Sequence, residues 1–289
     1  MPVKAVSPAA RAWPGEAWPD PSPQYVRSFW RGLSWRLRWS LSGRPWKFAL
    51  ASGSPLLSGQ SNRGERAYRL GHSEPEVVRF LSQFLESGMN FWDIGAHAGE
   101  FSTIAAGCVA PGGSVRAFEP HPLMFDLLSQ NLNQASCRVH VARKAVSDAE
   151  GSVEMVVSRC ASRLRAAGQE ITQEWVPSVS LDSVWALTST VPDLIRVSVG
   201  GAEPLVLAGA GGLLDLPVEE APVWIVAHHP RKLARFDLSA RYVLAEFGCC
   251  GYAVSWLTPQ GLIPATLRNL PQALGRNLVA FKRESGSRE

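Results

Sequence analysis

Apolar residues recur at two different spacings along most of the chain, and segments of the two kinds alternate. Spacings of three and four predict helices over residues 76–86, 100–109 and 122–132, and near 202–214 and 238–247. Short apolar or alternating runs predict strands over residues 90–94, 114–118, 139–146, 152–157, 193–199, 223–228, 252–257 and 277–282. Because strands that alternate with helices form parallel sheets, we expect an α/β fold with one doubly wound, mostly parallel sheet that uses nearly all of the chain.

The first quarter of the chain has a different pattern. Residues 1–24 are rich in Pro, Ala and Ser without periodicity, which predicts a flexible tail. A helical pattern then runs from residue 24 to 41, with apolar side chains on one stripe and arginines on another. The apolar stripe consists of Val26, Trp30, Leu33, Leu37 and Leu41. We therefore divide the chain into a tail (1–24), an amphipathic N-terminal helical extension (25–72) and a sheet domain (73–289).

Composition limits the class of protein. The chain has 289 residues, of which 46% are hydrophobic, enough to bury a sizeable core. Its apolar runs stay below the ~18 residues that would span a bilayer, and its first residues lack the apolar centre of a signal peptide. Five cysteines without C-x-x-C spacing argue against a disulfide framework or a metal site. We expect a reducing, cytoplasmic location and no bound metal.

Charge separates the extension from the rest of the chain. Residues 1–72 contain eleven Lys and Arg against three Asp and Glu, and six of the eleven tryptophans. Such a helix could pack its apolar stripe on the sheet domain and leave its arginines in water. It could instead lie on an anionic membrane through residues 25–47 as a peripheral contact. Nucleic-acid binding is unlikely on sequence grounds because the charge is local and the aromatic residues are mostly tryptophan.

Two acidic positions suggest a ligand site at the ends of the first two strands of the sheet domain. Asp93-Ile-Gly95-Ala-His-Ala-Gly99 connects a strand to a helix, and Glu119 ends the next strand, where a carboxylate can accept both hydroxyls of a ribose. The loop lacks the G-x-G-x-x-G spacing of dinucleotide sites, and the chain has no phosphate loop. The ammonium and sulfonium of S-adenosylmethionine suit a loop lined by carboxylates. The alternative is a purely structural turn.

At this point the sequence resembles the FkbM-type methyltransferases, S-adenosylmethionine enzymes of the class I fold. The resemblance rests on five segments in order, which cover residues 93–102, 117–120, 144–148, 176–182 and 193–203. It implies methyl transfer to a hydroxyl of a sugar, glycolipid or secondary metabolite, so that the partner would be a small molecule or a glycan or lipid acceptor. It also implies a set of cofactor-binding residues, namely Asp93, Gly95, Ala96, His97, Gly99, Glu119, Pro120, Ala145 and Val146.

The segment around residues 196–203 departs from the family pattern, which reads like K-I-D-V-E-G-A-E. Ser198 and Gly200 stand where the family has acids, and Ala227 stands where the next strand usually has a Glu. We therefore assign catalytic candidates among the polar residues that remain, His228, His229 and Glu203. A neutral imidazole could accept the proton of a hydroxyl.

Each of these catalytic candidates has a structural alternative. The histidines could bond loop backbone, and Glu203 could cap a helix start. The joint loss of three acids also fits a catalytically silent relative that binds a partner or a membrane.

Overall fold

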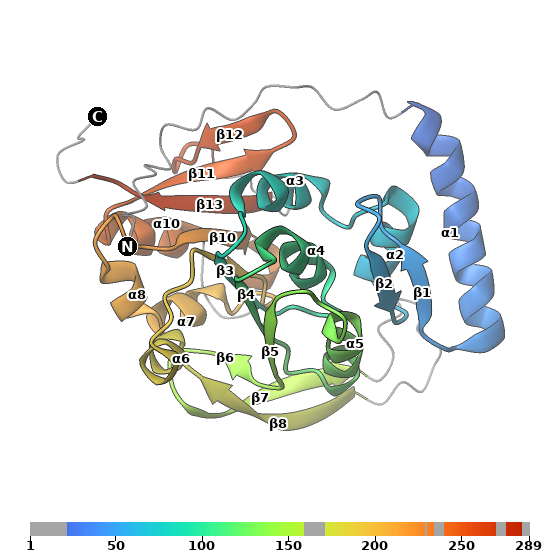
Figure 1. Cartoon of the computed structure of the whole chain (residues 1–289), viewed down its shortest axis with the longest axis horizontal. Helices are drawn as coiled ribbons and strands as arrows, with labels where there is room; N and C mark the ends of the chain where they lie inside the picture. Colours follow the sequence, from blue (N-terminus) through green and yellow to red (C-terminus); the bar gives the residue numbers. More distant parts are fainter. Residues whose placement is uncertain (1–21, 159–170, 229, 234–239, 270–275, 285–289) are drawn as a thin grey trace.

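The computed structural model describes residues 22–158, 171–228, 230–233, 240–269 and 276–284, and its centre is an eight-stranded sheet (Figure 1). The strand order is β12-β11-β13-β10-β9-β3-β4-β5. The strands are β3 (Asn90–Ile94), β4 (Ser114–Phe118), β5 (Arg138–Ala142), β9 (Leu194–Val197), β10 (Val223–His228), β11 (Tyr252–Thr258), β12 (Gly261–Pro264) and β13 (Arg276–Lys282). The five strands from β10 to β5 are parallel, and β13, β11 and β12 are antiparallel to their neighbours. The predicted doubly wound, mostly parallel sheet is confirmed.

The two faces of this sheet bury two separate hydrophobic clusters. Because side chains alternate along a strand, Phe91 packs into one cluster and its neighbour Trp92 into the other. The first cluster lies under α3 (Pro75–Phe84), α4 (Glu100–Val109) and α5 (Pro122–Leu132). The second is covered by α6 (Leu181–Thr188), α7 (Glu203–Ala208), α8 (Gly211–Asp215) and α10 (Ala240–Cys249). A short helix, α9 (Pro230–Leu233), follows β10.

The prediction that one sheet uses nearly all of the chain is wrong after residue 142. The expected strand at 139–146 divides into β5 and β6 (Ala145–Val146), with the exposed Arg143 and Lys144 between them. β6 pairs with β8 (Ile171–Val179), and β8 pairs with β7 (Gly151–Ser158), which forms a separate three-stranded sheet. The two exposed charged residues mark the point at which the chain leaves the central sheet and begins to pair with β8.

The N-terminal extension contains more structure than its periodicity predicts. After α1 (Ser22–Ser42) come a hairpin of β1 (Trp46–Ala49) and β2 (Pro55–Ser58) and a helix α2 (Asn62–Leu70). The hairpin is fixed to α5, because the backbone of Leu57 donates to Asn131 Oδ1 at 2.7 Å and accepts from Asn131 Nδ2 at 2.8 Å. Residues 1–21 of the predicted tail lie outside the described residues, and residues 22–24 begin α1.

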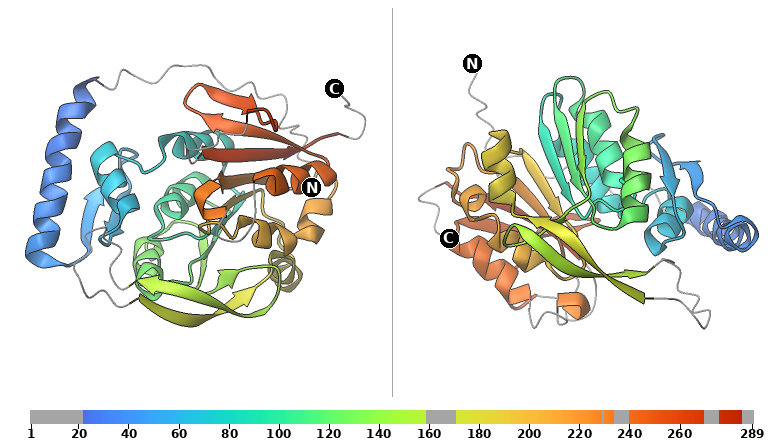
Figure 2. Two further views of the ribbon diagram at one scale, coloured as in Figure 1. Left: turned by 180° about the vertical axis from the view of Figure 1, so that it is seen from behind. Right: turned by 90° about the horizontal axis from the view of Figure 1, so that it is seen from below.

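The apolar stripe of α1 does not pack on the sheet domain. Trp30 is 62% exposed and Leu37 is 58% exposed, whereas Trp35 is buried among the rings of Trp46, Phe48 and Tyr68. Figure 2 shows α1 at the edge of the molecule, with the hairpin and α2 between it and the sheet. The interpretation in which this stripe packs on the sheet domain is therefore wrong. Among the helices described, none has both the length and the apolar composition needed to cross a bilayer.

Candidate functional site

The chain order reverses between β3 and β9, so the loops after β3, β4, β9 and β10 meet at the carboxyl edge of the parallel strands. Ligands of open α/β sheets bind at such a reversal. Of the predicted site residues that the structure describes, all but Ala145 and Val146 lie in or next to these loops.

The loop between β3 and α4 is held close to its neighbours by two glycines. Gly95 has φ 78° and Gly99 has φ 84°, as expected for a sharp turn. A Cβ atom at Gly95 would lie 2.3 Å from the carbonyl oxygen of Ser198, and one at Gly99 would lie 2.7 Å from Leu128. Glycine is therefore required at both positions because other atoms of the protein lie where a side chain would begin. The amides of Gly95 and Ala96 both donate to the carbonyl of Phe118, at 2.9 and 3.0 Å, which ties this loop to the end of β4.

Glu119 is fixed at the end of β4 by two backbone amides. Its Oε2 accepts from the amide of His97 at 2.7 Å, and its Oε1 accepts from the amide of His121 at 2.9 Å. The side chain is 7% exposed, and burial raises its pKa, while the two amide bonds oppose that shift. A carboxylate has about four lone-pair positions, so each oxygen keeps one acceptor position after these bonds. This arrangement fits the two hydroxyls of a ribose.

Asp93 has different partners from those expected. It is fully buried, with Oδ1 2.9 Å from Nη1 of Arg196 and Oδ2 2.6 Å from the hydroxyl of Ser102. Arg196, on β9, is also fully buried and lies over the ring of Phe101. In the described structure Asp93 therefore positions Arg196. Its predicted contact with a cofactor stays a prediction.

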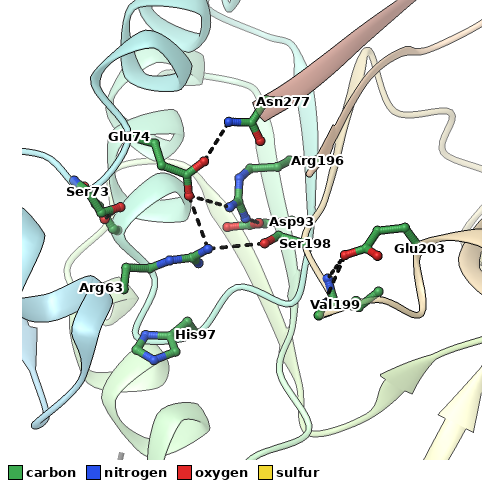
Figure 3. Close-up of polar contacts among 12 residues, drawn as sticks. Arg63, Ser73, Glu74, Asp93, His97, Arg196, Ser198, Val199, Glu203 and Asn277 are labelled. Carbon is green, nitrogen blue, oxygen red and sulfur yellow. Dashed lines mark hydrogen bonds and ion pairs between the residues drawn. The ribbon is translucent and has the colours of Figure 1, made fainter. Parts of the chain in front are cut away.

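Two residues that the sequence reasoning missed continue this charged group. Oε1 of Glu74, the residue just before α3, lies 3.3 Å from Nη2 of Arg63 on α2 and 3.7 Å from Nη2 of Arg196 (Figure 3). Oε2 of Glu74 accepts from Asn277 on β13 at 2.7 Å. Burial alone would raise the pKa of Glu74, but the two guanidinium groups and the amide of Asn277 outweigh it and lower that pKa. Glu74 is therefore a carboxylate held in its ionised form.

The extension also contacts the altered family segment directly. Nη2 of Arg63 donates to the hydroxyl of Ser198 at 3.2 Å, at the position where the family has an acid. Glu74 contacts the same nitrogen of Arg63, so a carboxylate from the α2–α3 connection lies beside the end of β9. A charged residue directly before a proline-initiated helix is common in sequences, and only the folded structure shows that this one faces β9.

Glu203 is bound by its own loop. Its carboxylate accepts from the amides of Val199, Gly200 and Gly201 at 3.1, 3.0 and 2.9 Å, and its side chain is fully buried. Burial raises its pKa, and the amide bonds oppose the shift. These three contacts support the structural alternative, in which Glu203 stabilises the loop before α7, over a catalytic role.

The histidine candidates have different surroundings. His228 is 2% exposed, and its ring centre lies 5.4 Å from that of Trp256, so access for an acceptor is limited. His229 lies outside the described residues. His97 is partly buried with φ 56°, and burial, together with the nearby charges of Arg63, His121 and Arg196, lowers its pKa to about 3. The catalytic role of the two strand-end histidines stays a prediction.

The remaining predicted cofactor contacts surround the end of β4. Pro120 directly follows Glu119, and the amide of Glu119 donates to the carbonyl of Ala142 at 3.1 Å. Ala145 and Val146 form β6 and pair with the small sheet. Their contact with an adenine stays a prediction. In the described part of the chain, no group of three His, Cys, Asp or Glu side chains could hold a metal ion.

Three of the proteins similar to this chain illustrate the comparison with known proteins. A hexuronic acid methyltransferase, AglP, from Haloferax volcanii is 27% identical over 146 residues, which cover 49% of this chain and 58% of that protein. The chain thus spans little more than half the length of this curated relative. A TehB-like methyltransferase from Corynebacterium glutamicum has a TM-score of 0.45 at 13% identity, with 76% and 95% of the two chains covered. Aeropyrum pernix fibrillarin has a TM-score of 0.42 at 10% identity, with 82% and 93% covered.

The family comparison covers the loops after β3, β4, β9 and β10. The model of the methyltransferase FkbM domain matches residues 93–252, which is more than half of the chain and extends from Asp93 to the start of β11. The resemblance inferred from the sequence segments is therefore confirmed, and with it S-adenosylmethionine as the family's methyl donor. This chain belongs to the methyltransferase FkbM domain family.

Proposed function

We propose that this chain transfers a methyl group from S-adenosylmethionine to a hydroxyl of a sugar, a glycolipid or a secondary metabolite. The observation that carries the proposal is Glu119, a carboxylate fixed by two amides at the end of β4 with acceptor positions that suit a ribose. Gly95, Ala96, His97 and Pro120 are its neighbours along the loops. Together with membership of a methyltransferase family, this arrangement favours an adenosyl ligand.

The bound cofactor supplies a methyl group that is already activated on a sulfonium. The residues of this chain then have to bind and orient the acceptor and deal with its proton. Arg63, Glu74 and Ser198 are polar groups near the end of β9 that can bond acceptor hydroxyls. Because the two guanidinium groups lower the pKa of Glu74, this carboxylate is a weak base, and we assign it to orienting Arg63.

An acidic sugar is the acceptor that fits this side best. The side chain of Arg63 is 20% exposed, and its contacts with Glu74 and Ser198 both use Nη2. A guanidinium has five N–H donors, so Arg63 could also bond the carboxylate of a uronic acid. The relative from Haloferax volcanii, named for a hexuronic acid, supports this class of acceptor.

We also propose that the chain works in the cytoplasm. Four cysteines of the described residues, Cys108, Cys137, Cys249 and Cys250, are free thiols, which suits a reducing compartment. Of these, only Cys249 is exposed.

Calorimetric titration with S-adenosylmethionine tests the cofactor part of the proposal, and we expect saturable binding. Incubation with labelled cofactor and a panel of acidic and neutral glycans then tests the transfer, with mass spectrometry for a gain of one methyl group. We expect methylation of an acidic glycan first. A lack of cofactor binding at millimolar concentration would contradict the proposal as a whole, whereas binding with transfer to neutral glycans only would contradict the acceptor class.

A second candidate function follows from the altered segment. Ser198, Gly200 and Ala227 replace three acids, and Glu203 is bound to its own loop. A catalytically silent relative that binds a partner or a membrane has the same features. Detectable methyl transfer by the unaltered chain would exclude this alternative. Cofactor binding without transfer to any glycan in the panel would favour it.

A further inference from the structure

The outward face of α1 is an apolar surface without a covering element in the described structure. Five large side chains of this helix are between 49% and 79% exposed, namely Phe29, Trp30, Leu33, Leu37 and Leu41. They are spaced so that they follow one side of the helix over about three turns, roughly 18 Å. We call these five residues the outer row.

The opposite side of α1 is fixed to the extension, so the outer row cannot turn inward without loss of contacts. Trp35 is 3% exposed and stacks with Trp46 and Tyr68. Arg69 on α2 donates to the carbonyl and the hydroxyl of Ser28, both at 3.3 Å. A Cβ atom at Gly32 would lie 3.2 Å from Arg69 Nε, which shows how closely the two helices approach.

The charges of this helix indicate the kind of partner. The 21-residue sequence of α1 contains four arginines and no Asp or Glu, and Arg31 and Arg36 are exposed. Arg44, just before β1, and Lys47, within β1, are exposed as well. A second copy of the chain docked on the same face would bring like charges together, which disfavours self-association. Apolar side chains with Trp, bordered by arginines, suit the interface of an anionic lipid bilayer.

We propose that α1 docks on an anionic membrane surface, with its axis in the plane of the interface and its outer row among the lipid headgroups and the upper acyl chains. The charges of Arg36 and Arg44 attract the helix to the anionic surface, and burial of the outer row holds it there. This proposal goes beyond the methyl-transfer function and does not depend on it.

The first test measures binding of the full chain to two kinds of vesicle, phosphatidylcholine alone and phosphatidylcholine mixed with phosphatidylserine, without cofactor or acceptor. We expect sedimentation with the anionic vesicles, and weaker binding at higher salt because charge attraction is screened. Equal binding to both kinds of vesicle, or binding to neither, would overturn the proposal. The calorimetric and transfer assays above are independent of lipid, so failure here is distinguishable from failure of the proposed function.

The second test uses variants with matched controls. Trp30→Ser, Leu33→Ser and Leu37→Ser together should abolish binding to anionic vesicles. The control combines Trp175→Ser, Leu187→Ser and Leu267→Ser, which removes the same residue types from exposed positions outside α1 and should bind normally. Circular dichroism establishes that both are folded. Equal loss of binding in the variant and its control would contradict docking through α1.

The third test reverses charge. Arg36→Glu with Arg44→Glu should weaken binding at least about twentyfold, since each basic residue near an anionic surface contributes about fivefold. The control is Arg268→Glu with Arg283→Glu, which reverses two exposed charges outside α1. An acidic protein would be favoured as the partner instead if an acidic polypeptide such as polyglutamate bound the chain while anionic vesicles did not, and that result would overturn the proposal.

Discussion

The two sides of one sheet edge are built differently in this protein. At the end of β4, Glu119 and its two amide bonds keep the arrangement that the family resemblance implies for a cofactor. At the end of β9, the strand acids are absent, and Arg63 from the extension and Glu74 from the α2–α3 connection lie there instead. The cofactor side thus depends on backbone geometry within the sheet domain. The acceptor side depends on charged side chains that come from outside the family-matched segment, residues 93–252.

The difference has a physical basis. Every residue except proline keeps its backbone N–H, so most substitutions at His97 and His121 would leave the two donors to Glu119 in place. A group of alternating charges needs all of its members, because removal of one leaves a buried partner without its counter-charge. We expect variants on the two sides to have separable effects, and the predictions below follow from the largest expected effect to the smallest.

The largest effect should come from Asp93→Asn. This change leaves the buried Arg196 without its closest counter-charge, and breaking a buried pair in this way costs about 3–5 kcal/mol. The free energy of unfolding from urea titration measures it. The matched control is Asp126→Asn, an exposed aspartate on α5, which should change stability by less than about 0.5 kcal/mol. A change as small as the control would show that Asp93 is not the residue that compensates Arg196.

The second effect concerns the cofactor side alone. Glu119→Ala should weaken S-adenosylmethionine binding by about 1.5–3 kcal/mol, the loss expected for hydrogen bonds to a charged group. Calorimetric titration measures the dissociation constant, with the exposed Glu150→Ala as control. Unchanged affinity in Glu119→Ala would mean that the ribose binds elsewhere.

The third effect should fall on the acceptor side. Arg63→Met removes the guanidinium proposed to contact an acidic acceptor, and we expect the KM for that acceptor to rise about tenfold, equivalent to about 1.4 kcal/mol. Affinity for the cofactor should change much less than in Glu119→Ala. Arg66→Met, an exposed residue on the same helix, is the control. If Arg63→Met weakened cofactor binding as strongly as Glu119→Ala, the separation of the two sides would be wrong.

The smallest effect near neutral pH is a pH dependence at the loop between the two sides. The pKa of His97 is about 3 in the folded chain and near 6.5 when unfolded, so the unfolded state binds the extra proton first as pH falls. Stability should therefore decrease as pH falls from about 6.5 towards 3. His97→Asn, which tolerates the positive φ, should reduce that slope. Denaturant titrations at several pH values measure it, and an unchanged slope would contradict the assignment.

Much of the sheet domain could be predicted from local pattern. Three of the five parallel strands, β3, β9 and β10, are short, mostly apolar runs buried on both faces, and glycine with positive φ at Gly95 follows from the sharp turn after β3. The turn of the chain into the small sheet could not be predicted in the same way. Arg143 and Lys144 form only a brief polar interruption, and whether the chain continues or leaves depends on pairing with the distant β8.

Only part of the candidate site could be predicted from the sequence, again because some of its contacts join residues that are far apart in the chain. Glu119 could be predicted as a site residue because it directly follows a strand that is recognisable from the neighbouring residues. The pairing of Asp93 with Arg196 spans 103 positions, and the contact of Arg63 with Ser198 spans 135. Contacts over such separations leave no periodicity or spacing for a sequence argument to use. The outer row of α1 shows the same limit, since an amphipathic pattern identifies an apolar face but not what covers it.

The helix α2 places two arginines at its opposite ends. Arg69 bonds α1 through Ser28, and Arg63, only six positions earlier, reaches Ser198 at the sheet edge. Helix α2 thus connects Arg63, which is proposed to bind the acceptor, with α1, which is proposed to bind a membrane. Both precede the family-matched segment, which begins at residue 93. Replacement of this N-terminal segment in evolution could therefore change the acceptor and the membrane contact without changing the residues proposed to bind the methyl donor.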